Sequence, residues 1–256
     1  MQAGAATVSD LVREPRTYVG KLRSTEDLFR GRHFDRQVII LCVRWYLRYK
    51  LSFRDLVEMM AERGLDLAHT TILRWVRRYA SEFVKRWNRI ARCCGRSWRV
   101  DETYIKVRGN WVYLYRAVDK ARQTIDFRLS RTRDVAAAKA FFKKTMQHEG
   151  RLPPTITLDG YAASHRAVRE LRDDGILPKR LKLRSSKYLN NLIEQDHRGI
   201  KSRTRPMLGF KSFASAANVI AGIELLRRIH KRQFALSKLR RKNQTAPALW
   251  MTVLAA

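Results

Sequence analysis

The chain has 256 residues, of which 45% are hydrophobic, and this is enough to bury a sizeable core in one or two domains. Its 54 Lys and Arg residues outnumber its 23 Asp and Glu residues and give a formal net charge of +31, which favours a polyanionic partner such as nucleic acid. The longest apolar runs are far too short to span a bilayer, and the N-terminus lacks the pattern of a secretory signal. The three cysteines include no C-x-x-C pair, so we expect a cytoplasmic protein without disulfides or a membrane partner.

The first part of the chain predicts an N-terminal arm over residues 1–28, followed by an all-α domain over residues 29–95. No clear period runs through the arm, whereas a helical pattern begins at Phe34. Ser52 and Asp55 have the spacing of a capping box at the start of a helix, and Gly64 marks a turn. Another helix is predicted to begin at Thr70 or Thr71.

The last two helices of this domain are similar to a helix-turn-helix. The second of them begins with hydroxyl side chains and continues with arginines, which suits contacts with DNA. The candidate DNA-binding residues here are Thr70, Thr71, Arg74, Arg77 and Arg78. An ordinary helical hairpin with a solvated basic face is the alternative, and the charge of the whole chain favours DNA binding.

After Gly95 the pattern changes from helical to alternating and predicts an α/β domain over residues 96–235. Three strands come first, with a turn at Gly109-Asn110, and alternating helices and strands follow. A helix is predicted to be capped by Asn190 or Asn191 and to run towards Arg205, before Pro206. This order predicts a ribonuclease H-like core, which is a mixed five-stranded sheet with helices. A further helix is predicted from Ser212, and residues 236–256 are predicted to form a C-terminal tail.

Three carboxylates stand out on these elements. Asp101 lies inside the first strand, where Asp is disfavoured, and Asp159 ends a hydrophobic strand, where open α/β sheets bind ligands. Glu194 lies in the first turns of the last core helix. By contrast, Glu102 is predicted to point to the opposite face of the sheet from Asp101, because side chains alternate along a strand.

A convergence of these three carboxylates would be repulsive unless cations were bound between them. Carboxylate oxygens suit Mg²⁺, which accepts substrate phosphates as further ligands, and two such ions roughly 3.5–4 Å apart promote phosphoryl transfer. The sequence therefore predicts a site for two Mg²⁺ ions held by Asp101, Asp159 and Glu194, with Mn²⁺ as an acceptable substitute. A surface salt bridge for Glu194 is the alternative.

The segment around Glu194 is strongly basic, which fits a phosphate partner. Lys201 follows Glu194 by seven positions and so lies on the same helical face, as does His197, which is equally interpreted as structural or catalytic. We expect Lys201 to hold a phosphate beside the metal ions. Further candidate DNA contacts in this segment are Arg198, Arg203 and Arg205.

Three blocks of the chain resemble the bacterial DDE transposases of the family named after insertion sequence six, whose members form cointegrates. These blocks are SWRVDETYIKVRGNWVYLYRAVD, DFRLSRTRDVAAAKAFF and YLNNLIEQDHRGIKSRTRPMLGFKSFASA. The resemblance extends from about Phe29 to about Phe234. The catalytic triad of the family falls on Asp101, Asp159 and Glu194, and its basic residue falls on Lys201.

The resemblance implies Mg²⁺-dependent cleavage at terminal inverted repeats and transfer of the resulting 3′-hydroxyl into target DNA. Our hypothesis for the mechanism is that Asp101 bridges both ions and that Asp159 and Glu194 each hold one. The expected partner is double-stranded DNA at the bacterial nucleoid, bound by a homodimer or a larger assembly because two ends must be held together. The alternatives are a helix-turn-helix regulator without catalysis and a ribonuclease H-like nuclease that only hydrolyses.

Overall fold

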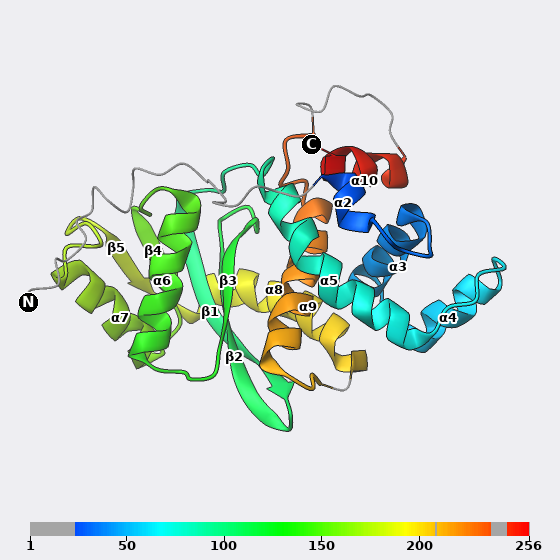
Figure 1. The fold of residues 1–256 in the computed structure, drawn as a ribbon. Coiled ribbons are helices and arrows are strands. Elements are labelled where there is room, and N and C mark those ends of the chain that lie inside the picture. The colour runs from blue at the N-terminus through cyan, green and yellow to red at the C-terminus, as the bar shows by residue number, and fades with distance from the viewer. Residues whose placement is uncertain (1–23, 208, 237–244, 256) are drawn as a thin grey trace, which may run out of the picture. The chain divides into compact units, whose positions relative to one another are not determined.

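The computed structural model describes residues 24–207, 209–236 and 245–255, which divide into two compact units (Figure 1). Cys93–Gly199 form one unit, here called the sheet unit. The described residues before Cys93 and after Gly199 form the other, here called the helical unit. In the described part of the chain, no helix is both long enough and apolar enough to cross a membrane.

The sheet unit contains five strands in the order β3-β2-β1-β4-β5. Their bounds are β1 Ser97–Val107, β2 Asn110–Val118, β3 Thr124–Ser130, β4 Thr155–Leu158 and β5 Lys182–Ser185. The first three strands pair antiparallel, whereas β1 pairs with β4 and β4 with β5 in parallel. The predicted mixed five-stranded sheet with helices is therefore confirmed.

Two helices connect the strands of this unit, and local residues fix where they lie. The helix α6 (Val135–Glu149) begins at Asp134, whose side chain accepts the Ala137 backbone amide, and ends at Gly150 with φ +64°. The helix α7 (Ala162–Asp173) follows β4. Buried side chains of both helices pack with those of the sheet in one apolar core, which includes Trp98, Ile156, Phe141, Phe142 and Val168.

The helix α8 (Lys187–Thr204) begins in the sheet unit and ends in the helical unit. It starts before both Asn190 and Asn191, so the predicted cap at these residues is wrong. The physical reason is the short connection: β5 ends at Ser185, and Ser186 alone separates the strand from the helix. A 3₁₀ turn at Arg205–Met207 follows, consistent with the predicted stop at Pro206.

The helical unit consists of six further helices among the described residues. Their bounds are α2 Thr25–Phe29, α3 Arg36–Arg48, α4 Phe53–Ala61, α5 His69–Asn88, α9 Phe213–His230 and α10 Ala246–Ala255. Ser52 and Asp55 form the predicted capping box at the start of α4, and Gly64, with φ +70°, lies in the turn between α4 and α5. The helix α5 begins at His69, so Thr70 and Thr71 both lie in its first turn.

The end of the chain differs from the prediction of a tail, since residues 246–255 form α10. Trp250 is buried, with its ring centroid 5.2 Å from that of Phe83 and 5.1 Å from that of Trp87, both on α5. The Leu254 carbonyl accepts hydrogen bonds from Thr25 and Arg86. Trp250 has apolar neighbours on α5, and this contact stabilises a helix that its sequence alone did not indicate.

The two units also divide the chain differently from the predicted domains. Residues after Gly199, predicted within the catalytic domain, belong to the helical unit. The reason lies in α9, whose buried Val219, Ile220 and Ile223 leave it with an apolar face, and which contacts α5 and α3. At the other end, all of α2 except Phe29 lies within the predicted N-terminal arm, while residues 1–23 of that arm are outside the described residues.

Candidate active site

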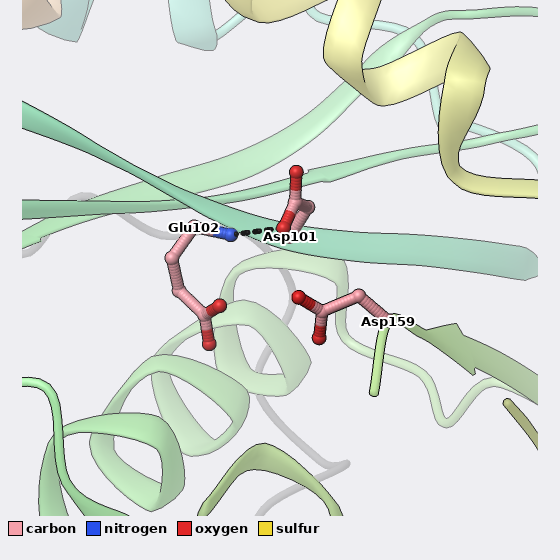
Figure 2. A group of neighbouring side chains, drawn as sticks. All are labelled: Asp101, Glu102 and Asp159. Carbon is pink, nitrogen blue, oxygen red and sulfur yellow. Dashed lines mark hydrogen bonds between the residues drawn. The ribbon is translucent and has the colours of Figure 1, made fainter. Parts of the chain in front are cut away.

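A cluster of three carboxylates lies where β1 and β4 run side by side. One oxygen from each of Asp101, Glu102 and Asp159 lies within 4.8 Å of the other two. The strand register explains the meeting, because Arg99 of β1 pairs with Thr157 of β4, and Asp101 and Asp159 each come two residues later. The structure therefore brings together two of the three predicted acids, and adds Glu102 (Figure 2).

Asp101 and Glu102 contact helices on opposite faces of the sheet. His197 Nε2 of α8 lies 3.2 Å from an oxygen of Asp101, whereas Ser164 of α7 donates a hydrogen bond to Glu102. Figure 2 shows the two side chains leaving β1 in different directions, with Asp159 reaching toward them from the end of β4. The predicted opposite orientation of Glu102 is thus confirmed, yet its longer side chain still brings its carboxylate into the cluster.

Burial and charge make this cluster electrostatically costly without a cation. Burial raises the pKa of Glu102 above its ordinary value, and the neighbouring Asp159 and Asp101 raise it further. The hydrogen bond from Ser164 and the charge of Arg133, 3.4 Å away, oppose this shift. Three carboxylates within reach of one another offer the hard oxygen ligands that divalent cations take, so the residues fit a metal ion.

The loop after β4 holds Asp159 in place through backbone contacts. An Asp159 carboxylate oxygen accepts the Tyr161 amide at 3.0 Å, and the Asp159 carbonyl lies 2.7 Å from Nε2 of His165. The Tyr161 hydroxyl donates to the Arg133 carbonyl at 2.6 Å, and the Arg133 guanidinium lies 3.7 Å from the centre of the Tyr161 ring. Since Arg133 also approaches Glu102, one set of contacts connects two of the three acids.

Among the described side chains, Asp196 and His197 in the middle of α8 contact the sheet. One contact is the approach of His197 to Asp101, and burial lowers the pKa of His197 although Asp101 opposes that shift. The other is an ion pair between the buried Arg116 of β2 and Asp196. These contacts place the imidazole of His197 beside the cluster. From its spacing in the sequence, His197 was interpreted equally as structural or catalytic.

Glu194, the third predicted acid, is exposed on α8. Within the described residues it is not a member of the group that lies within 4.8 Å. It precedes His197 by one helical turn and so lies on the face of α8 that carries His197. Lys201, which is partly buried, follows on the same helix two turns after Glu194.

The predicted DNA contacts differ in exposure. Thr70, Arg74, Arg77 and Arg78 are exposed on α5 and Thr71 is partly buried, while Arg198 and Arg205 are exposed. Arg203 is buried, and its guanidinium donates to the carbonyls of Tyr46 and Leu51 and lies 4.7 Å from the centre of the Tyr46 ring. Its charge thus stabilises backbone inside the helical unit, and Arg203, at 3% exposure, has almost no surface to present to a phosphate.

Comparisons with known proteins agree on one class of enzyme. A family described as a DDE domain matches residues 95–233. The transposase for insertion sequence-like element IS431mec of Staphylococcus aureus (strain N315) is 40% identical over 210 residues, which cover 80% of this chain and 89% of that protein. The transposase for insertion sequence element IS257 in transposon Tn4003 of Staphylococcus aureus is 39% identical over the same shares of the two chains.

Among solved structures, the catalytic core domain of BIV integrase aligns with this chain over 51% of this chain and 82% of the integrase chain. Its sequence identity is 17%, and its TM-score of 0.38 is too low to define the fold.

Proposed function

Because this chain belongs to the DDE insertion-sequence transposases of the family named after insertion sequence six, we propose that Asp101, Asp159 and Glu194 are its catalytic triad. The enzyme carries out DNA transposition and depends on a divalent metal for nucleotidyl transfer. The observation that supports the assignment is the approach of Asp101 and Asp159 within 4.8 Å. Asp101 lies inside β1 and Asp159 directly follows β4, so two adjacent strands of the sheet carry the pair.

Asp101 and Asp159 would hold the metal, with Glu102 beside them. We infer that the metal is Mg²⁺, in two ions, because the ligands are all carboxylate oxygens. When bound, such ions stabilise negative charge on a phosphate and favour ionisation of an attacking hydroxyl. The chain's own contribution is to fix the acids: the Tyr161 amide orients Asp159, and Ser164 together with Arg133 orients Glu102.

Glu194 would complete the triad from α8. It lies one turn before His197, whose imidazole already contacts Asp101. A change of side-chain conformation in an exposed residue is a small rearrangement, so Glu194 could join the cluster once cations remove the repulsion. Lys201, two turns further, would then hold a phosphate oxygen of the DNA.

The helical segment 29–95 would bind the terminal inverted repeats, and residues 96–235 would carry the chemistry. Exposed Arg74, Arg77 and Arg78 on α5 support phosphate and base contacts, with Thr70 and Thr71 in the first turn of the same helix. Arg198 and Arg205 are exposed and would contact the backbone of DNA. Because two transposon ends must be joined to one target, we expect a dimer or a larger assembly on DNA, at the bacterial nucleoid.

A strand-transfer assay tests this assignment. The full chain is mixed with a labelled, pre-cut terminal repeat and a plasmid target, with and without Mg²⁺. We expect Asp101→Asn to abolish joined product while the protein binds terminal DNA as tightly as before. The control is Asp173→Asn, which changes an exposed aspartate at the end of α7 and should leave joining intact. Metal-dependent joining by the Asp101→Asn variant would contradict the triad. If the unmodified chain joins no strands, metal-dependent nicking of the plasmid would favour a nuclease that only hydrolyses, and no nicking would favour a DNA-binding regulator.

A further inference from the structure

An exposed aromatic pair lies on the hairpin formed by β1 and β2. Tyr104 is 53% exposed and Trp111 is 55% exposed, although both lie within strands. Their ring centroids are 4.9 Å apart, and the planes meet at 74°, so the edge of one ring faces the other. Lys106 lies with its ammonium 5.6 Å from the centre of the Trp111 ring. We call Tyr104, Lys106 and Trp111 the hairpin platform.

The hairpin platform lies on the sheet face to which Glu102 points. Side chains alternate along β1, so Glu102, Tyr104 and Lys106 share one face. On β2, Trp111 pairs with Lys106 and Tyr113 pairs with Tyr104, which places both aromatics on that same face. A strand rises about 3.3 Å per residue, so Tyr104 and Lys106 lie roughly 7 and 13 Å along β1 from Glu102. One continuous face therefore leads from the carboxylate cluster to the platform.

The platform is held by a rigid support. Tyr113, next to Tyr104 on the adjacent strand, packs against the core of the sheet unit. The hairpin closes through Arg108 and Gly109, with φ of +51° and +80°, which is the tight turn that suits the twist of two strands. Since β3 pairs with β2 only as far as Tyr113, the hairpin extends beyond its neighbour in the described sheet (Figure 1).

The charge around the hairpin platform indicates which class of molecule it binds. From Thr103 to Val118 the sequence contains no Asp or Glu, and Lys106 and Arg108 are exposed beside the aromatic pair. Two copies of the platform facing each other would bring the cations Lys106 and Arg108 of both chains together, and this repulsion disfavours a contact between two platforms. Exposed aromatic rings between cations are instead what single-stranded nucleic acid requires, because bases stack on the rings and phosphates pair with the cations.

We propose that the hairpin platform stacks against unpaired bases of the DNA strand that leaves the carboxylate cluster. The inference rests on the proposed function, which places a phosphate at that cluster. A DNA strand advances about 3.4 Å per nucleotide, so the platform would meet bases about two to four nucleotides from the reacting phosphate. Stacking tolerates any base, which suits flanking or target DNA of variable sequence.

Binding of the full chain to two DNAs tests this proposal without requiring catalysis. Both carry the terminal repeat, but one is fully paired, whereas the other, the forked DNA, has unpaired nucleotides beside the cut position. The fluorescent base 2-aminopurine replaces the second, third or fourth nucleotide from the cut. We expect the chain to quench 2-aminopurine in the forked DNA. Tyr104→Ala and Trp111→Ala should remove the quenching and weaken binding of forked DNA about tenfold, with paired DNA unaffected.

Conservative variants and salt separate stacking from a loss of folding. Trp111→Phe should keep most of the affinity, and Tyr49→Ala, which removes an equally exposed ring elsewhere, should change nothing. Lys106→Ala should reduce the slope of log Kd against log salt by about one, whereas Trp111→Ala should leave the slope unchanged.

Unchanged quenching and affinity in Trp111→Ala would overturn the proposal, as would an equal loss on paired DNA. The molar mass of the assembly in solution is measured without DNA. If Trp111→Ala forms a smaller oligomer than the unmodified chain, the platform is a protein interface and the proposal is overturned. If the unmodified chain quenches the probe but never joins strands, the proposed function fails while the platform stands.

Discussion

Asp196→Ala should destabilise the sheet unit strongly, because it removes the carboxylate paired with the buried guanidinium of Arg116. The side chain of Arg116 is 0% exposed and that of Asp196 is 7% exposed, so water cannot replace the lost partner. Removing one member of a buried ion pair costs about 3–5 kcal/mol. Single domains are stable by only about 5–15 kcal/mol, so the variant would lose a large part of its stability.

Urea unfolding measures the loss in the free energy of unfolding, and amide hydrogen exchange shows which segments are destabilised. We expect faster exchange in peptides from β1, β2 and the middle of α8, because Asp196 connects that helix to β2. The matched control is the double variant Arg116→Met with Asp196→Leu, which removes both charges and should recover most of the stability. A loss below about 1 kcal/mol in Asp196→Ala would refute the reasoning, because it is the size expected of an exposed pair.

The remaining predictions concern the metal site, the DNA-binding helix and the C-terminal helix. Glu102→Gln should raise the Mg²⁺ concentration needed for half-maximal strand transfer by about tenfold or more, whereas the control Glu170→Gln, on α7, should not. If Glu102→Gln needs the same Mg²⁺ concentration as the unmodified chain, Glu102 does not belong to the metal site. Arg77→Gln should weaken binding of paired DNA and lower its salt slope by about one, and an unchanged slope would mean that Arg77 makes no phosphate contact. Trp250→Ala should cost about 3–5 kcal/mol of stability in thermal or urea unfolding, and a near-neutral result would show that α10 packs only loosely.

The carboxylate site was partly predictable because strand signals are local, whereas the register between β1 and β4 was not. Asp101 inside an alternating segment and Asp159 at the end of an apolar strand were sufficient to predict that they meet. Glu102 was missed as a member of the cluster because alternation places it on the other face, which is correct for the Cβ but ignores the reach of a longer side chain. The available signal was the Asp-Glu pair itself, since both residues are disfavoured in strand interiors.

The features that the sequence could not predict depend on contacts between distant segments. Arg203 belongs to a basic run that suits DNA, yet it is buried because Tyr46, 157 positions away, offers a carbonyl and a ring. Trp250 of α10 likewise packs against Phe83 and Trp87, which lie more than 160 positions earlier in the sequence. Neither partner has a fixed spacing from its residue, so periodicity carries no information about these contacts.

The central claim, a metal site between Asp101 and Asp159, is tested most directly by locating the metal itself. Crystals of the full chain with a pre-cut terminal repeat and Mn²⁺ would give anomalous scattering at each bound ion. We expect two peaks beside Asp101, one of them also coordinated by Asp159 and the other by Glu194 of α8. Metal peaks remote from Asp101, or a fully loaded DNA complex with no peak beside it, would contradict the account.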